Sequence, residues 1–599
     1  MIETSEIKWD LSIIFKDNEE AKAFIKINEK DITNLRKELK GHINRDNIHA
    51  NEVYKFLEKL NKISAKIEGI FYFARNQLYA DQTIKESLVL MNTASDLYMK
   101  GKMIVASFEI ELGQLLLKRA ELINEPQLKS YKHYLEKLVR KTQYMLSENE
   151  EQLILEKDRY GSNGWTKLQS EWLSSRQFKI IDEGVEKTVT WGEFGKYSRA
   201  PNRETRKNAL INMVGENGLA KDKELFAATL RNICGDHVLT SKRRDQPTTF
   251  TSSLITNDIT QIMIDHLLEV VKENANLYQD FLLLKAKIMS TEKLLGEDLW
   301  VPIPILPEKF KLFNWENAKE IVLKVFNEFD EEFGSIARKM FDENHIDASP
   351  RKGKRAGAYC STIEFMKEAF ILMSFTESLA DVGTLAHEMG HAVHSYLSIK
   401  QQKFLNNSVS FCVAETASEF GRFLLVDNIR RNTDDEIVKK FILFNHLETL
   451  ATIIFEVGSR TSFEKSLYDA IEVGEYLDAD KISELFVKAR KQFFGDAIEF
   501  LPEQRFDWTW KPHYYRIDLR YYNYPYYFAE LLVMSLYNRY KKEGNSFVPK
   551  FKRFLACGGS KSPLELGKEM GVNLEAKEFW QMGLNEFKAI LEETKKLFQ

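Results

Sequence analysis

The sequence of 599 residues predicts a mainly α-helical protein, on three observations. No proline precedes Pro126, and the first 125 residues are rich in Lys, Glu, Leu and Ile at helical spacing, which predicts long antiparallel helices. Residues 378–398 repeat apolar side chains at three- and four-residue steps, which predicts another helix. Only residues 178–185 and 187–191 have the alternation of a small hairpin. Helices are therefore expected to dominate the fold.

Two breaks in the helical pattern indicate how the chain is divided. Arg199-Ala200-Pro201 separates a predicted N-terminal helical domain, 1–198, which includes the hairpin, from a second domain over 199–599. Residues 301–307 contain three prolines and predict a connection rather than a helix. The sequence has no internal repeat and no low-complexity tract.

Composition and charge are those of an ordinary globular protein, with 44% hydrophobic and 29% charged residues. The net charge of −4 favours neither nucleic acid nor an anionic membrane as a partner. Residues 1–6 do not have the pattern of a secretory leader, and no apolar run reaches about 18 residues. Four scattered cysteines predict free thiols in a reducing cytosol: Cys234, Cys360, Cys412 and Cys557. We therefore expect a cytoplasmic protein.

The helix predicted over 378–398 has one face on which histidines are flanked by small residues. It begins with the capping-box pattern Ser378-x-x-Asp381. Its apolar stripe consists of Val382, Leu385, Met389, Val393 and Tyr396. At about 100° per residue, three histidines fall on the opposite side: His387, His391 and His394. Small residues flank these histidines, and Gly390, costly in mid-helix by about 1 kcal/mol, predicts the close approach of a neighbour or ligand.

The motif His-Glu-Met-Gly-His at 387–391 predicts a zinc site. Residues four apart lie on one helix face, so His387 and His391 present two imidazoles to one point. Two neutral imidazoles suit Zn²⁺, and Glu388 is placed to take a proton from metal-bound water, whose pKa zinc lowers from about 16 towards about 7. His394 lies one turn further along the same face and is expected to touch a ligand residue or the substrate.

A catalytic zinc site needs a third protein ligand and an open position. The metzincin pattern fails, because His394 and Leu397 stand where that pattern requires Gly and His. Glu415, 24 residues after His391, is the candidate on a return helix. Glu419 is the alternative ligand, although we expect it to support a ligand and to pair with Arg422.

These residues, together with other segments, resemble the oligoendopeptidase F branch of the thimet-oligopeptidase-like zinc metallopeptidases. The resemblance runs nearly end to end and is strongest between about Gly353 and Leu584. The segments that carry it are 9–11, 353–360, 387–394, 415–418, 556–560, 562–563 and 579–584. It implies a large two-lobed helical metallopeptidase with a deep central cleft, a small β-sheet near the zinc helix and a gluzincin-like catalytic domain over 199–599. It also implies a cytoplasmic endopeptidase that binds one zinc per chain and cuts short peptides.

The resemblance assigns roles to two further segments. Residues 368–375 are apolar and predict a strand, which is either core or the edge strand that pairs with the substrate backbone. In the tyrosine-rich stretch 513–528, His513 and one or two of the tyrosines are implied to face the substrate and stabilise the oxyanion. The candidate tyrosines are, in order of preference, Tyr522 and Tyr526, with Tyr524 also possible by position. The glycine-rich loop of thimet-type members is replaced here by residues 516–520.

Two other functions fit the zinc motif. A zinc aminopeptidase shares the two histidines and the downstream Glu, but this chain has no Gly-x-Met-Glu-Asn element for gripping a free N-terminus. A non-catalytic helical peptide-binding protein with a structural zinc is the second. Glu388 disfavours it, because a structural site closes its fourth position with a protein ligand.

Overall fold

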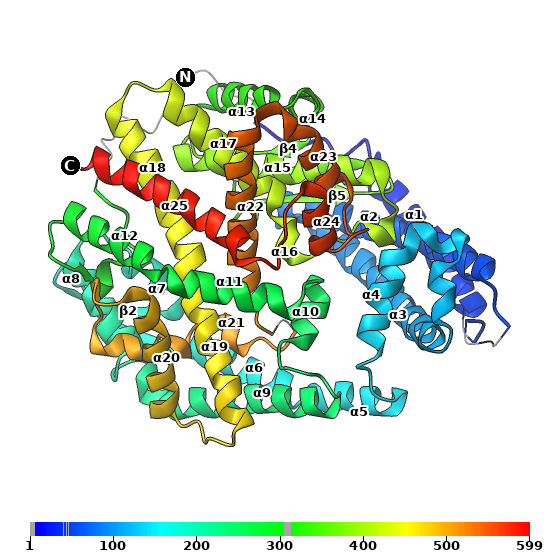
Figure 1. Ribbon diagram of the computed structural model, residues 1–599, viewed down its shortest axis with the longest axis horizontal. Coiled ribbons are helices and arrows are strands. Elements are labelled where there is room, and N and C mark those ends of the chain that lie inside the picture. Colours follow the sequence, from blue (N-terminus) through cyan, green and yellow to red (C-terminus); the bar gives the residue numbers. More distant parts are fainter. Residues whose placement is uncertain (1–5, 40, 44, 46, 305–312, 519) are drawn as a thin grey trace. The chain divides into compact units, whose positions relative to one another are not determined.

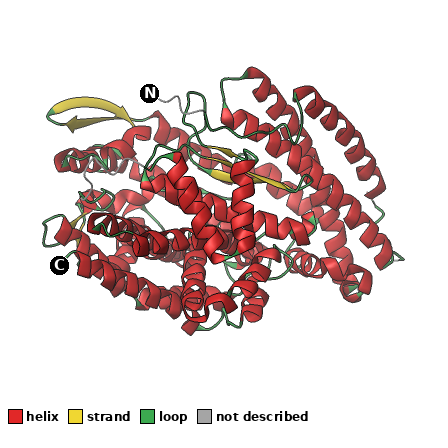
Figure 2. Cartoon of the chain, turned by 90° about the horizontal axis from the view of Figure 1, so that it is seen from above, coloured by secondary structure: helices red, strands yellow, loops and turns green. Residues whose placement is uncertain are grey.

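The computed structural model describes residues 6–39, 41–43, 45, 47–304, 313–518 and 520–599. Most of them are helical and the strands are few and short (Figure 2), which confirms the predicted mainly α fold. The chain forms two compact units, each built from three segments. Unit 1 contains Met1–Gln143, Leu306–Asp434 and Leu536–Leu574, and unit 2 contains Tyr144–Ile305, Asp435–Ser535 and Glu575–Gln599. The predicted domain division after residue 198 falls within unit 2 and stays a prediction.

Unit 1 contains the N-terminal helices, a three-stranded sheet and the helix with the His-Glu-Met-Gly-His motif. Its elements, all but β6 labelled in Figure 1, are α1 (Asn18–Leu39), α2 (Ala50–Ala80), α3 (Lys85–Lys118), α4 (Lys132–Thr142), α13 (Trp315–Phe329), α14 (Glu331–Asp342), β4 (Ile346–Asp347), β5 (Tyr359–Ile363), β6 (Glu368–Leu372), α15 (Leu379–Gln401), α16 (Phe411–Ala414), α17 (Thr416–Asn432), α23 (Val548–Ala556) and α24 (Pro563–Met570).

Unit 2 contains the hairpin and the tyrosine-rich stretch. Its elements are α5 (Glu148–Asp158), α6 (Ser162–Ser175), β1 (Gln177–Asp182), β2 (Val185–Thr190), α7 (Phe194–Tyr197), α8 (Arg203–Ala209), α9 (Lys223–Arg243), α10 (Thr251–Asn257), α11 (Gln261–Glu273), α12 (Ala275–Ile288), β3 (Leu294–Leu295), α18 (Glu436–Ala451), α19 (Val457–Glu472), α20 (Ala479–Phe494), β7 (Ile498–Glu499), α21 (Pro512–Tyr515), α25 (Lys577–Leu597) and the first part of α22 (Tyr524–Glu543).

Within the described part of the first 125 residues, α1, α2 and α3 are long helices, as predicted. Their apolar stripes pack into one core, because isolated helices gain most of their stability from burying such a face. Ile363 of β5 and Phe370 of β6 are fully buried in the same core. The N-terminal helices therefore hold the sheet of unit 1 in place.

The predicted hairpin is confirmed as β1 and β2, which pair antiparallel from Gln177 opposite Thr190 to Asp182 opposite Val185. Its two-residue turn has positive φ at both positions, 51° at Glu183 and 82° at Gly184, as a type I′ turn requires. In the proline-rich connection, residues 301–304 are neither helix nor strand, and residues 305–307 lie outside the described part of the chain.

One helical stretch, Glu436–Glu472 in unit 2, is long and apolar enough to cross a membrane by length and composition. Of its most apolar window, 67% is buried inside the fold. A core helix covered by its neighbours meets the same criteria, so this stretch gives no reason to assign a membrane span.

The sheet of unit 1 has the strand order β4-β6-β5. β6 pairs in parallel with β4 on one side, Ile346 opposite Ile371, and antiparallel with β5 on the other, Tyr359 opposite Leu372. The strand predicted over 368–375 is therefore present, but its alternative role as the edge strand is wrong, because β6 is the central strand. In the described chain the two edge strands of this sheet are β4 and β5, and β5 is the longer of the two.

Helices α15 and α17 cross with their backbones in contact. A Cβ atom added at Gly390 would lie 2.3 Å from the carbonyl oxygen of Ala417 and 2.6 Å from Cα of Ser418. A Cβ added at Gly421 would lie 2.9 Å from the carbonyl oxygen of Ala386. The predicted close approach at Gly390 is confirmed, and the neighbour is α17. Because any larger residue would force the helices apart, these glycines set the distance between them.

We expect Gly390→Ala to lower the free energy of unfolding by about 1–3 kcal/mol, because the new methyl group overlaps backbone atoms that cannot rotate away. The shift of the chemical unfolding midpoint measures the effect. Gly383→Ala is the matched control in the same helix: its Cβ would meet nothing within 4 Å, so the better helix propensity of Ala should leave stability equal or higher. Equal stability of the two variants would contradict the close crossing.

Candidate metal centre

Helix α15 presents its histidines as the sequence predicts. The capping box is confirmed, since the Ser378 hydroxyl accepts from the Asp381 amide at 3.1 Å and the Asp381 carboxylate accepts from the Ser378 amide at 3.1 Å. Most of the apolar stripe is buried: Val382, Leu385, Met389 and Val393 have no exposed surface. Burial of that face fixes the rotation of α15 and leaves His387 and His391 half-buried on the other side.

Glu415 lies between the two imidazoles. Its Oε2 atom is 3.3 Å from Nε2 of His387 and 3.2 Å from Nε2 of His391. One ligand atom from each of the three residues lies within 4.8 Å of the others. Glu415 occupies the position before the first residue of α17, so the close crossing of α15 and α17 brings it to the histidines. The structure thus brings together the three side chains predicted as metal ligands.

The charges in this cluster suit a cation. Burial disfavours a charged imidazole, but hydrogen bonds to Glu415 and Glu419 raise the pKa of His387 to about 10. Burial alone would raise the pKa of Glu415, yet the hydrogen bonds from His387 and His391 hold it well below its usual range. Without a metal, the carboxylates therefore hold a proton on His387. A divalent cation would replace that proton, and two imidazoles with one carboxylate are a donor set that suits zinc.

Further side chains fix the orientation of His387 and Glu415. Glu419 is 7% exposed, and its carboxylate lies 3.1 Å from Nδ1 of His387 and 3.2 Å from Nη1 of Arg422. Arg422 counteracts the cost of burying this carboxylate and holds its pKa below the usual range. The Ser418 hydroxyl donates to Oε2 of Glu415 at 2.9 Å. The predicted pairing of Glu419 with Arg422 is present, and Glu419 contacts the nitrogen of His387 that faces away from Glu415.

Glu388 is buried beside the cluster, with 6% of its surface exposed. Its Oε2 atom is buried and has no hydrogen-bond partner among the described residues. Burial raises the pKa of this carboxyl group, which suits a group that accepts and returns a proton near neutral pH. Glu388 directly follows His387 in α15 and is not one of the three converging donors.

A cavity of about 830 Å³ lies beside the cluster, within unit 1. His391 and His394 line it from α15 and residues 359–362 line it from β5. Side chains of α2 and α3, Tyr134 of α4 and residues between 404 and 414 also contribute to its wall. His394 is 6% exposed, and burial lowers its pKa to about 4, which keeps the imidazole neutral. It lines the cavity one turn beyond His391, in agreement with its predicted place near a ligand residue or a substrate.

The other predicted site residues belong to unit 2, where they form their own cluster. The ring of His513 stacks on Tyr522 at 5.3 Å and meets Tyr526 edge-on at 6.5 Å, and the two tyrosine rings lie 5.4 Å apart. Tyr522 and Tyr526 are half-buried, whereas Tyr524 is buried and its hydroxyl lies 3.0 Å from the Ser253 hydroxyl. Tyr524 therefore has a packing role, which leaves Tyr522 and Tyr526 as the accessible phenols of the three.

His513 is held in its neutral form. Burial, followed by the nearby charges of Arg460, Lys511 and Arg516, lowers its pKa to about 4. Its Nδ1 atom is buried without a hydrogen-bond partner among the described residues. In the segment that replaces the glycine-rich loop, Arg516 stacks over Tyr522 at 4.8 Å and donates to Asp518 at 3.0 Å. Leu519 of this segment lies outside the described residues.

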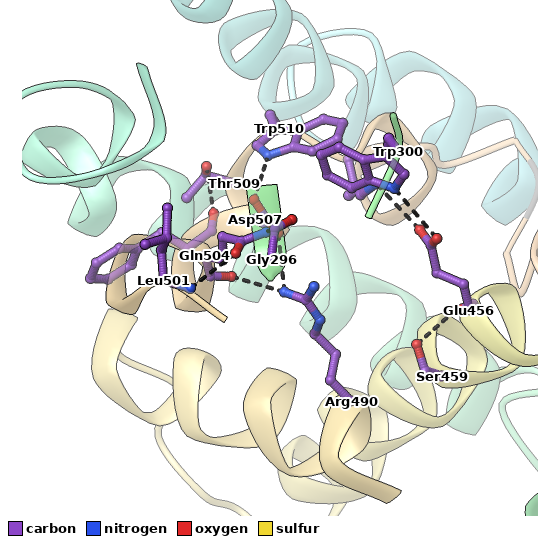
Figure 3. A network of polar contacts seen from close by, with 12 residues as sticks. Gly296, Trp300, Glu456, Ser459, Arg490, Leu501, Gln504, Asp507, Thr509 and Trp510 are labelled. Atoms are coloured by element: carbon purple, nitrogen blue, oxygen red, sulfur yellow. Dashed lines mark hydrogen bonds and ion pairs between the residues drawn. The ribbon is translucent and has the colours of Figure 1, made fainter. Parts of the chain in front are cut away.

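A buried polar network fixes the segment that leads to His513 (Figure 3). Arg490 donates to the carboxylate of Asp507 and to the carbonyl of Gln504, both at 3.1 Å. The Trp510 indole also donates to Asp507, at 3.2 Å, and the Trp300 indole reaches Glu456 at 3.5 Å. Since the paired charges are inside the fold, breaking one pair would leave an uncompensated charge, so the network holds this segment rigidly.

Sequence reasoning missed two parts of this arrangement. Ser418 lies within the segment 415–418. Its position three residues after Glu415, at the start of a helix, could have indicated the hydrogen bond. The cavity wall from α2 and α3 had no such signal, because α3 ends at Lys118 and α15 begins only at Leu379.

Comparison with known proteins gives consistent matches. The family model described as Peptidase family M3 matches residues 310–586, and the model described as Oligopeptidase F matches residues 118–178. The oligoendopeptidase F homolog of Borreliella burgdorferi is 28% identical over 622 aligned positions that cover 100% of both chains. Among solved structures, a protein from Chlamydophila abortus has a TM-score of 0.88 at 21% identity over 99% of both chains. Oligoendopeptidase-F from Enterococcus faecium has a TM-score of 0.70 at 22% identity and covers 97% of this chain and 99% of its own.

We expect Glu415→Ala to bind zinc more than roughly 100-fold more weakly than the parent chain, because it removes one of three donors. Glu419→Gln keeps all three donors but loses the charge that orients His387, so roughly a 10- to 100-fold loss is expected. Titration with a zinc-selective fluorescent competitor measures both affinities. If Glu415→Ala bound zinc normally while Glu419→Gln did not, Glu419 would be the ligand.

Proposed function

We propose that this chain, a member of the oligoendopeptidase F branch of peptidase family M3, is a zinc-dependent endopeptidase that hydrolyses internal bonds of short peptides. The observation that carries the proposal is the convergence of His387, His391 and Glu415 on one point, with the buried carboxyl group of Glu388 beside it. One zinc ion per chain would be held by these three residues. A non-catalytic peptide carrier would have no use for a buried carboxyl group whose Oε2 has no hydrogen-bond partner among the described residues.

Zinc held by these residues would supply a Lewis acid that polarises the scissile carbonyl and lowers the pKa of water, so that the water loses its proton as it attacks. Glu388 takes the proton of the attacking water and passes it to the leaving amine. Burial raises the pKa of Glu388, which makes its carboxylate a better proton acceptor than an exposed one. Glu419, Arg422 and Ser418 keep the donors in position and take no part in the proton transfer.

The substrate backbone would add a strand to the open edge of β5. This edge borders the cavity, and the Thr362 hydroxyl is 2.7 Å from the Ser395 hydroxyl of α15, one turn beyond His391. Main-chain hydrogen bonds to an edge strand are made whatever the side chains of the peptide. This mode of binding supports broad specificity for short, extended peptides.

We assign stabilisation of the developing oxyanion to Tyr522 and His513, with Tyr526 as the second phenol. The support is their mutual ring contact, the partial exposure of both tyrosines and the neutral state of His513, which leaves an N–H to donate. The phenol that contributes more is the one whose replacement lowers kcat further when Tyr522→Phe is compared with Tyr526→Phe.

The proposed function also includes a division into two domains, a location in the cell and a class of partners. The two family-model matches fall on opposite sides of residue 198, which supports a catalytic domain over 199–599 preceded by a helical domain over 1–198. We propose a cytoplasmic location, which the bacterial oligopeptidase relatives support, with short peptides as the partners and neither nucleic acid nor membrane as a ligand.

We expect Glu388→Gln to reduce kcat by roughly 100- to 10,000-fold, the range contributed by a positioned general base, while zinc stays near one per chain. Gln keeps the shape of the side chain but accepts no proton. Turnover of a fluorogenic peptide and metal analysis of the same sample give the two numbers. Normal turnover in this variant would remove Glu388 from the mechanism.

An internally quenched peptide blocked at both ends tests the reaction itself. We expect internal cleavage that a chelator abolishes and added zinc restores. A peptide with a free N-terminus serves as the comparison. Cleavage of that peptide alone, from its first residue, would identify an aminopeptidase, and no cleavage of either peptide would favour a non-catalytic peptide-binding protein.

A further inference from the structure

Two arginines line the cavity beside the candidate metal centre, and aromatic rings hold both guanidinium groups. The Arg75 guanidinium of α2 lies 4.3 Å from the ring centre of Tyr72 and 5.0 Å from that of Tyr359. The guanidinium of Arg355 lies 4.4 Å from Tyr79 and 5.9 Å from Tyr359. Stacking fixes the plane of a guanidinium group without using its N–H donors.

The acidic and the arginine side chains that line the cavity differ in whether they have a partner of opposite charge or a hydrogen-bond partner. Each acidic side chain has a polar partner: Glu68 has Lys102 at 4.0 Å, Glu109 has Tyr134 at 3.0 Å, and Glu364 has Asn407 at 3.0 Å. In the described part of the chain, no carboxylate lies within 4.0 Å of Arg75 or Arg355. The Nε atom of Arg75 is also buried without a hydrogen-bond partner there. The cavity therefore offers donors for an anion at Arg75.

The direction of β5 places this anion site at the carboxyl end of a peptide bound to that strand. A peptide that pairs antiparallel with the open edge of β5 runs from the Ile363 end towards Tyr359. Thr362 is tied to α15 near the metal centre, whereas Tyr359 carries the ring shared by both arginines. The residues that follow the scissile bond would thus extend towards Arg75, and so would the carboxyl end of a short peptide.

We propose that Arg75, with Arg355 beside it, binds the free C-terminal carboxylate of the peptide substrate. The proposal rests on the proposed endopeptidase function and adds the end of the peptide that the enzyme recognises. A planar guanidinium matches a carboxylate with two parallel hydrogen bonds, and the rings that hold Arg75 reduce the entropy lost on binding. Recognition of a chain end favours short peptides over internal segments of long chains.

Three peptides that are identical up to the last residue test the proposal: a free acid, its C-terminal amide, and an amide whose last residue is replaced by Asp. We expect the parent enzyme to cleave the free acid with a kcat/KM roughly 10- to 100-fold above that of either amide, mostly through KM. Arg75→Gln should cleave the free acid only as well as the amide and should keep the parent rate on the amide. That unchanged amide rate shows that the variant is folded.

Arg159→Gln is the matched control, because Arg159 stacks over Tyr160 at 5.5 Å but is not among the residues that line the cavity. It should keep the preference for the free acid. A parent enzyme that does not distinguish acid from amide, or an Arg75→Gln variant that still does, would overturn the proposal. Cleavage of the aspartyl amide at the free-acid rate would overturn the assignment to the chain end. If the parent cleaved none of the peptides, the proposed endopeptidase function would fail instead.

Discussion

The contact between the backbones of α15 and α17 is the constraint on which the metal centre depends. Gly390 and Gly421 allow the two helices to approach until only main-chain atoms separate them. Glu415, at the start of α17, is thereby held about 3.3 Å from two imidazoles that α15 presents one turn apart. A side chain at either glycine would move the carboxylate away from the histidines, so the two glycines act on the metal site without touching it.

The same crossing creates an electrostatic problem that neighbouring residues solve. It buries the carboxylate of Glu419 and leaves that of Glu415 half-buried next to it. Arg422 and the imidazole of His387 counter the charge of Glu419, while His391 and the Ser418 hydroxyl contact Glu415. An unpaired carboxylate in such a place would be costly. The alternation of acid and base along this chain of contacts permits burial and also orients each donor towards the metal position.

A feature of the fold or of the site could be predicted from the sequence only where contacts between residues close in sequence determine it. The helix of 378–398, its capping box and the shared face of His387 and His391 follow from the spacing of residues within one helix, and the structure has all three. The position of β6 was mispredicted as a possible edge, because β4 consists of only two residues, Ile346 and Asp347, and has no periodic signal. The cavity wall was equally inaccessible to sequence reasoning, since α2 and α3 reach it only through tertiary packing.

Three of the buried polar atoms without partners belong to residues to which we assign functions. Oε2 of Glu388, Nδ1 of His513 and Nε of Arg75 are all buried and unpaired among the described residues. Each such group costs roughly 1–3 kcal/mol of stability. That cost is reasonable if a partner arrives with the substrate: a water proton for Glu388, the oxyanion for the imidazole, a carboxylate for the guanidinium. By contrast, Glu419 has its partners within the protein, which agrees with a role in holding His387 and not in the chemistry.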